Sequence, residues 1–94
     1  MTTYVMCGTY SQDSIKKISA ERTDKMKEIV RRLNGKLISA YALLGEKDLL
    51  LLVEFDNMEQ AMKCSIELAK ELDIKFSTFQ AISVEEFDKI VESS

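Results

Sequence analysis

A chain of 94 residues, 46% hydrophobic and 31% charged, is expected to form one small globular domain over residues 1–94. Its formal net charge of −3 argues against nucleic acid and against an anionic membrane surface as partners, because both attract basic proteins. The chain has no histidine, which excludes a Ser-His-Asp triad, a Cys-His pair and a histidine-ligated metal within it, so we expect no metal site and no cofactor.

The N-terminal residues and the cysteines predict a cytoplasmic protein. Residues 1–10 lack the basic start and the apolar stretch of a secretion signal. No apolar run reaches the roughly 18 residues that a membrane-spanning helix needs. Cys7 and Cys64 are therefore expected to be free thiols in a reducing compartment, acting as small hydrophobic side chains rather than as a redox pair.

The first half of the chain predicts a strand, a helix with a break in it, and a second strand. Apolar residues recur at helical spacing from Ile15 to Leu33, but the gap between Ile18 and Met26 and a second N-cap candidate, Ser19, indicate a break. The predicted elements are a strand at Thr3–Tyr10, a helical turn capped by Ser11, a helix from Ser19 to about Leu33 ended by Asn34-Gly35, and a strand at Lys36–Leu44.

The second half predicts a strand that closes a hairpin, a helix, another strand and a short last helix. Gly45-Glu46-Lys47 is the expected hairpin corner. Asn57 with Gln60, and Ser83 with Glu86, have the spacing of capping boxes, which mark helix starts. The predicted elements are a strand at Asp48–Phe55, a helix from Asn57 to about Leu72, a strand at Ile74–Ile82 and an amphipathic helix from Val84 to about Val91.

This order of elements is that of a ferredoxin-like α+β fold, βαββαβ, with an extra C-terminal helix. Right-handed crossovers place both long helices on one face of a four-stranded antiparallel sheet whose first and third strands are central. The run Leu49–Val53 is apolar on both of its faces, so the face without helices needs a cover. A homodimer packed sheet to sheet, a dimeric α+β barrel, is the simplest cover. The alternative is a monomer whose last helix folds across the sheet.

Several segments, taken in order, resemble the GYD domain family of small bacterial and archaeal proteins. They are TYVMCGTY, SAER, NGKLISAYALLGEKDLLLLVEF, MEQAMK and AISVEEFDKIV, and they extend over about Thr3 to Val91. The family is named for a Gly-x-Tyr-Asp corner. Gly45, Glu46 and Asp48 match that corner, whereas Lys47 stands where the family usually has Tyr. The resemblance implies a ferredoxin-like fold of the dimeric α+β barrel kind and implies no activity.

The candidate ligand-binding residues are the tyrosines and the hairpin corner. Tyr4, Tyr10 and Tyr41 lie on strands or strand ends, where a phenol can point into a cavity between sheet and helices. A phenol is a weak acid and a poor base, and packing at a sheet face or interface is its commoner use. Lys47 beside Asp48 can hold an anionic ligand at the mouth of a cleft. A solvated turn, with Asp48 accepting backbone hydrogen bonds, is the simpler interpretation.

No catalytic constellation is visible, so we leave open whether the chain is an enzyme and favour a non-catalytic role. The first hypothesis is a homo-oligomer, a dimer or larger, that binds a small organic molecule under its helices. The second is a cofactor-free monooxygenase, isomerase or cyclase, and the third is a regulator that binds partners through a strand edge or a helix face. A pocket lined by tyrosines favours binding, whereas an added lysine or carboxylate with a strongly shifted pKa favours an enzyme.

Overall fold

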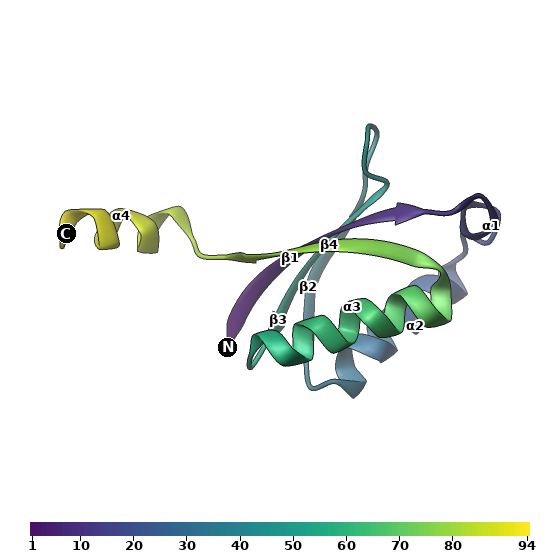
Figure 1. Cartoon of the computed structure of the whole chain (residues 1–94), viewed down its shortest axis with the longest axis horizontal. Coiled ribbons are helices and arrows are strands. Elements are labelled where there is room, and N and C mark those ends of the chain that lie inside the picture. Colours follow the sequence, from purple (N-terminus) through teal and green to yellow (C-terminus); the bar gives the residue numbers. More distant parts are fainter.

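The computed structural model describes residues 1–94 and contains one four-stranded sheet. The strand order is β2-β3-β1-β4, and every neighbouring pair is antiparallel. The first and third strands are therefore central, and the predicted ferredoxin-like α+β fold is confirmed. The elements are β1 (Thr2–Tyr10), α1 (Gln12–Ile15), α2 (Ala20–Arg32), β2 (Lys36–Ala42), β3 (Leu49–Phe55), α3 (Met58–Leu72), β4 (Ile74–Ala81) and α4 (Val84–Glu92), shown in Figure 1.

Serine caps produce the break between α1 and α2. Ser11 and Ser14 form a capping box: the Ser11 hydroxyl accepts a hydrogen bond from Ser14 N (2.9 Å), and Ser11 N donates to the Ser14 hydroxyl (2.8 Å). The Ser19 hydroxyl accepts from Arg22 N at 3.1 Å. These bonds satisfy amide groups that the first turn of a helix leaves unpaired, which fixes each start. The predicted break near Ser19 is thus confirmed.

The later caps differ in detail from the predicted capping boxes. Asn57 Oδ1 accepts from Gln60 N at 3.1 Å, but the Gln60 side chain accepts from Asp56 N rather than from Asn57 N. The Ser83 hydroxyl accepts from Glu86 N at 3.1 Å. Both helices therefore begin where the sequence predicts, each through the first half of the motif.

The hairpin between β2 and β3 is longer than the predicted corner. β2 ends at Ala42 instead of Leu44, and β3 begins at Leu49, so residues 43–48 form the connection. Gly45 has a φ of 151°, a conformation that side-chain-bearing residues rarely adopt. The apolar pair Leu43-Leu44 has the propensity of a strand, but the turn geometry takes it out of the ladder. The hairpin tip rises on the side of the sheet away from α2 and α3 (Figure 1).

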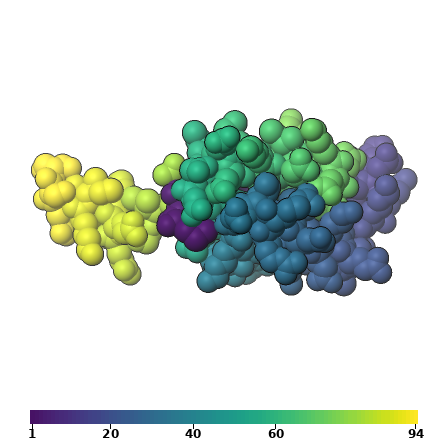
Figure 2. All heavy atoms as spheres, turned by 90° about the horizontal axis from the view of Figure 1, so that it is seen from below, coloured from purple at the N-terminus to yellow at the C-terminus, as the bar shows by residue number.

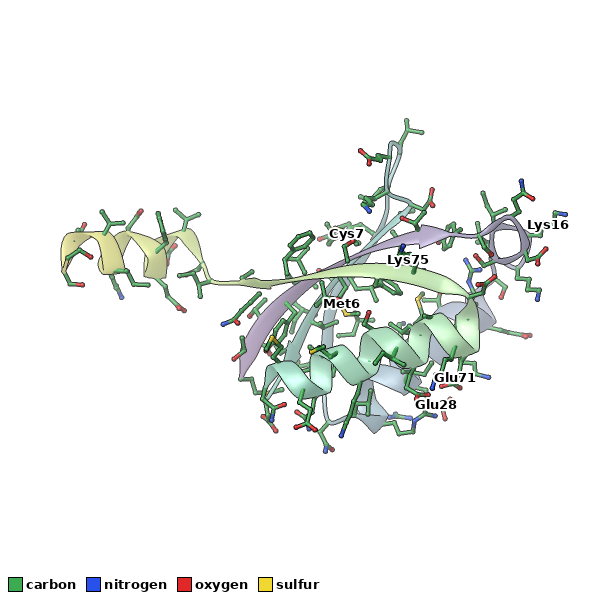
Figure 3. The ribbon with its side chains drawn as sticks, in the orientation of Figure 1. Met6, Cys7, Lys16, Glu28, Glu71 and Lys75 are labelled. Carbon is green, nitrogen blue, oxygen red and sulfur yellow. The ribbon has the colours of Figure 1, made fainter.

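The hydrophobic core lies between the sheet and the two long helices. Alternate residues of the central strands point into it, and Met6, Leu51 and Phe55 are fully buried there. Figure 3 shows Met6 on the helix side of the sheet and Cys7 on the opposite side. The helices contribute Met26, Ile29, Val30, Ala61, Cys64 and Leu68 to this core.

None of the helices combines the length and the apolar character that crossing a bilayer requires.

Gly35→Ala is expected to destabilise the fold because the new methyl group would overlap a buried ring. A Cβ at Gly35 would overlap Cε1 of Phe55 and lie 2.7 Å from its Cδ1, and this side chain is fully buried and cannot swing into solvent. Overpacking of this kind costs about 1–3 kcal/mol. Urea denaturation of the variant measures the loss. In a Phe55→Leu background the same change should cost less, and an equal cost in both backgrounds would contradict the overlap as its cause.

The face of the sheet away from the long helices is apolar at its centre and carries no helix (Figure 1). The strand register sets Val5 between Leu52 and Phe79, and Cys7 beside Leu50. Because side chains on a strand alternate, these residues face away from the core that their neighbours fill. We call this set the open-face cluster: Val5, Cys7, Tyr41, Leu50, Leu52 and Phe79.

Helix α4 does not cover the open-face cluster. It projects beyond the end of β4, away from the rest of the chain (Figures 1 and 2). None of its residues is buried, although its apolar side chains recur at helical spacing. The alternative in which the last helix folds across the sheet is therefore not observed. The exposed apolar residues of α4 are Val84, Phe87, Ile90 and Val91.

Candidate functional site

A small, mostly apolar pocket lies where the edge strand β2 passes the first turns of α2. Its volume is about 240 Å³, and 7 of its 10 lining residues are hydrophobic. Ser19 and Met26 line it from the α2 side, and Ala40 and Tyr41 line it from β2. Tyr10, at the end of β1, is also part of the wall. We call this hollow the corner pocket.

Arg22 is the one charged residue in the wall of the corner pocket. Its side chain is largely enclosed, with 8% of the residue exposed. The guanidinium carbon lies 4.6 Å from the centre of the Tyr10 ring, which is the geometry of a cation–π contact. Nη1 donates a hydrogen bond to the carbonyl oxygen of Ser14, and no acidic side chain pairs with the group. A guanidinium has five N–H donors, so most of them have no protein partner.

The structure brings only some of the candidate ligand-binding residues named from the sequence to the corner pocket. Tyr10 and Tyr41 both line the corner pocket, although the register with Leu50 puts the Tyr41 side chain in the open-face cluster. Tyr4 is 3% exposed and lies in the core. Asp48 Oδ2 accepts a hydrogen bond from Tyr10 N at 2.9 Å, so it ties the hairpin to the end of β1, as the turn interpretation expects of this carboxylate. Lys47 is partly buried in the hairpin connection.

Sequence reasoning does not single out Arg22, which is one of many charges on a mixed helix. A signal is nevertheless present in its position. Arg22 follows the N-cap Ser19 by three residues, in the first turn of α2. Side chains on a helix lean toward its N-terminus, so a long cation here reaches back over the break. The carbonyl of Ser14, at the end of α1, accepts from Lys17 N at 3.1 Å and accepts a second hydrogen bond from Arg22 Nη1.

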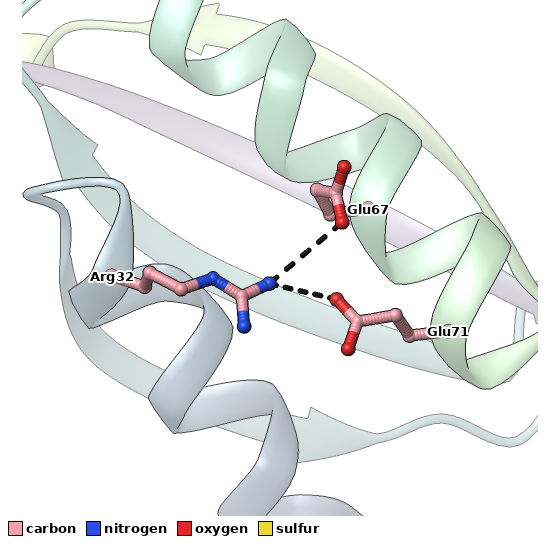
Figure 4. A network of polar contacts seen from close by, with 3 residues as sticks. All are labelled: Arg32, Glu67 and Glu71. Atoms are coloured by element: carbon pink, nitrogen blue, oxygen red, sulfur yellow. Dashed lines mark hydrogen bonds and ion pairs between the residues drawn. The ribbon is translucent and has the colours of Figure 1, made fainter.

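The outer surface of the helical layer carries a separate group of charges. Arg32 Nη2 lies 2.8 Å from Glu71 Oε2 and 3.7 Å from Glu67 Oε2, which links α2 to α3 (Figure 4). The hydrogen bond from Arg32 lowers the pKa of the Glu71 carboxyl below its ordinary value. All of these side chains are partly exposed, and solvent screens such pairs, so we regard the network as a surface contact between helices.

Solved structures with this fold include regulatory proteins. A feast or famine regulatory protein from M. tuberculosis, complexed with L-methionine, has a TM-score of 0.66 at 11% identity, over 88% of this chain and 51% of that chain. FFRP-DM1 has a TM-score of 0.58 at 23% identity, over 87% of this chain and 100% of that chain. A hypothetical protein from Pyrococcus horikoshii has a TM-score of 0.56 at 24% identity, over 88% of this chain and 92% of that chain. At these identities the likeness shows the fold alone.

This chain is about half as long as several of the regulatory proteins with this fold. In three of them, the M. tuberculosis protein included, the match covers 51% of their own length. No protein of curated function matches the sequence. The family model of the GYD domain matches residues 4–91, which is nearly the whole chain and includes the Gly45–Asp48 corner. This chain therefore belongs to the GYD domain family.

Proposed function

We propose that the chain is a homodimeric module that binds a small organic molecule and does not catalyse a reaction. One observation carries the binding role: the corner pocket is mostly apolar, and its wall holds an enclosed guanidinium without an acidic partner. An apolar pocket with a few convergent polar groups is the usual form of a small-molecule site. The M. tuberculosis regulatory protein of the same fold forms a complex with L-methionine, which supports this fold as a host for small ligands.

The open-face cluster supports self-association. It lies at the centre of the sheet, where β1 and β3 are flanked by the edge strands, and neither the long helices nor α4 cover it. Monomeric proteins rarely leave a contiguous apolar patch larger than a few hundred Å² exposed. A second copy of the chain presents the same patch, and a twofold interface requires only that a patch be complementary to itself. We therefore place the sheets of two copies face to face.

Helix α4 supports the same dimer from an independent direction. It has 9 residues, none of them buried. Isolated helices shorter than about 12–15 residues are marginal in water, so a helix this short needs a packing surface. Its own chain supplies none. Because α4 follows β4, the edge strand that contributes Phe79 to the open-face cluster, we place α4 on the second copy as an arm that continues the sheet interface.

The composition of the corner pocket favours binding over catalysis. Its titratable side chains are Tyr10 and Arg22, because Tyr41 lines it from β2 while its side chain belongs to the open-face cluster, and no carboxylate or lysine lines it. General acid–base catalysis needs a group that can accept a proton near neutral pH, which a guanidinium or an ordinary phenol does poorly. The cofactor-free monooxygenase, isomerase or cyclase therefore receives no support from this wall.

Native mass spectrometry of the protein purified from its source tests both parts of the proposal. We expect the mass of two chains, together with a small organic molecule that is lost on denaturation. Substituting Tyr10→Ala should remove the bound molecule without changing the number of chains in the assembly. A chain that stays single at micromolar concentration would contradict the dimer. A dimer that never carries a ligand, from its source or after incubation with metabolite mixtures, would contradict the binding role.

Thiol labelling reports the sheet interface on the unmodified chain. Cys7 belongs to the open-face cluster, whereas Cys64 is fully buried in the core. Burial raises the pKa of the Cys64 thiol to about 12, so it should react slowly with iodoacetamide at pH 8 in every state of assembly. Cys7 should react only in the monomer. Above the dissociation constant the monomer fraction falls with the square root of concentration, so a hundredfold rise should slow Cys7 labelling about tenfold.

Cys64 is the internal control of that measurement. If Cys64 labels as fast as Cys7, the chain is opening globally, which a denaturant titration of the labelling rate then identifies. A Cys7 rate that does not depend on concentration, with Cys64 protected, would contradict the proposed sheet-to-sheet contact.

A further inference from the structure

The charge in the corner pocket defines which ligands it can hold. Arg22 brings one positive charge into a wall that is otherwise apolar or neutral. An enclosed charge without a partner is unfavourable, and an anionic ligand would supply the missing partner. A singly charged ligand would leave the pocket neutral, whereas a phosphate dianion would leave a negative charge uncompensated among apolar side chains.

The surroundings of Arg22 do not change this balance. A more polar hollow of about 440 Å³ lies on the other side of Arg22 and Ser19, between α2 and the end of α3. Its lysines, Lys17, Lys25 and Lys70, share the wall with the acidic residues Glu21, Glu71 and Asp73, of which Glu71 pairs with Arg32. These charges line the other hollow, and the one charge in the wall of the corner pocket is that of Arg22.

The orientation of the guanidinium suits a planar anion. The guanidinium carbon lies 4.6 Å from the centre of the Tyr10 ring, and Nη1 donates to the carbonyl of Ser14. The N–H donors that remain lie in the guanidinium plane, as the paired donors of a bidentate carboxylate contact do. Ser19, the N-cap of α2, lines the same wall, so the positive end of the helix dipole adds to the attraction.

We propose that the corner pocket binds a small monocarboxylate with an apolar body, and that Arg22 holds its carboxylate. This inference rests on the proposed binding function and names the chemical class of its ligand. The apolar body packs against Met26, Ala40 and Leu49 in the same wall. No acidic side chain lines the pocket, so nothing there pairs with an ammonium group. The pocket should therefore prefer a simple carboxylic acid to the amino acid with the same carbon skeleton.

A matched set of probes tests the assignment on the unmodified chain. The probes are 4-methylpentanoate, its neutral isostere 4-methylpentanamide, and L-leucine, which adds an ammonium group to the same skeleton. Each is titrated into the full ¹⁵N-labelled chain, and the amide signals of Tyr10, Ala40, Tyr41 and Ala42 report the pocket. We expect 4-methylpentanoate to shift these signals and to bind at least about tenfold more tightly than the other two, since a charge-assisted hydrogen bond is about twice as strong as a neutral one.

Variants then assign the preference to Arg22. Arg22→Gln should abolish the difference between the acid and the amide, and Arg22→Lys should retain part of it. Arg31→Gln, the same change at an exposed position of α2, should leave all affinities unchanged. Arg22 also holds the end of α1, so Arg22→Gln can fail to fold. In that case the comparison of the three probes on the unmodified chain decides the matter alone.

The outcomes separate this inference from the binding function on which it rests. Equal binding of acid and amide in the corner pocket would overturn the carboxylate assignment and leave small-molecule binding intact. Tighter binding of L-leucine than of 4-methylpentanoate would overturn it as well, because the pocket would then recognise the ammonium group. Shifts confined to the polar hollow around Lys17 and Lys70, and produced equally by inorganic phosphate, would show unspecific anion attraction and would also overturn it.

Discussion

Replacing Leu52 by glutamate is expected to split the proposed homodimer into folded monomers. Leu52 pairs with Val5 on one side and with Ser39 on the other, at the centre of the open-face cluster. By symmetry the change puts a carboxylate on each side of the interface. Desolvating each costs several kcal/mol, and the apolar contacts of Leu52 are lost as well. A loss of about 4 kcal/mol corresponds to a roughly thousandfold weaker dimer, which sedimentation velocity over a concentration series measures.

Met62→Glu is the matched control for that experiment. Met62 is 56% exposed on α3, and the substitution introduces the same charge on the opposite side of the molecule. This variant should stay dimeric and keep the far-ultraviolet circular dichroism of the parent, whereas the Leu52→Glu monomer should lose only the helical signal of α4. If Met62→Glu dissociates the assembly and Leu52→Glu does not, the copies associate through their helices, and the sheet-to-sheet arrangement is wrong.

The arrangement of strands and helices can be predicted because local patterns and sheet topology agree. The alternation in β1 and β3, the caps at Ser11 and Ser19 and the Asn34-Gly35 ending each depend on neighbours within a few residues. The topology rules then leave few ways to join the elements. The predicted hairpin corner is too short because Leu43-Leu44 has the propensity of a strand, and only the turn geometry excludes it.

The corner pocket can be predicted only in part, because it depends on contacts between distant segments. Strand positions make Tyr10 and Tyr41 candidates, yet their meeting place depends on how α2 crosses the edge of the sheet. The role of Arg22 depends on Tyr10 and Ser14, neither of which is next to it on the helix. The composition and the periodicity of the sequence do not indicate such contacts between distant residues. The same holds for α4, because the surface on which we propose that it packs belongs to a second copy of the chain.

Ending the chain after Ile82 is expected to weaken the dimer strongly while leaving the monomer as stable as before. None of the removed residues is buried in the monomer, so the core between the sheet and the long helices should unfold at an unchanged temperature in dilute solution. If α4 packs on the second copy, the truncation removes the apolar contacts of two arms. Burying the exposed half of Phe87 alone is worth about 1 kcal/mol per copy, so loss of the whole stripe should exceed about 3 kcal/mol, a more than hundredfold increase in the dissociation constant.

Point variants show whether this loss comes from the apolar stripe of α4. Phe87→Ala should weaken the dimer by about tenfold or more, because each interface contains two copies of the side chain. Asp88→Ala, one residue further along, should leave the affinity unchanged, since Asp88 is polar and exposed. Helicity supplies a second readout: a helix of this length is stable only when packed, so dilution of the full chain below its dissociation constant should reduce the helical signal by the contribution of α4. A truncated chain that dimerises as tightly as the full one would show that α4 serves a different partner, and that the sheet alone holds the two copies together.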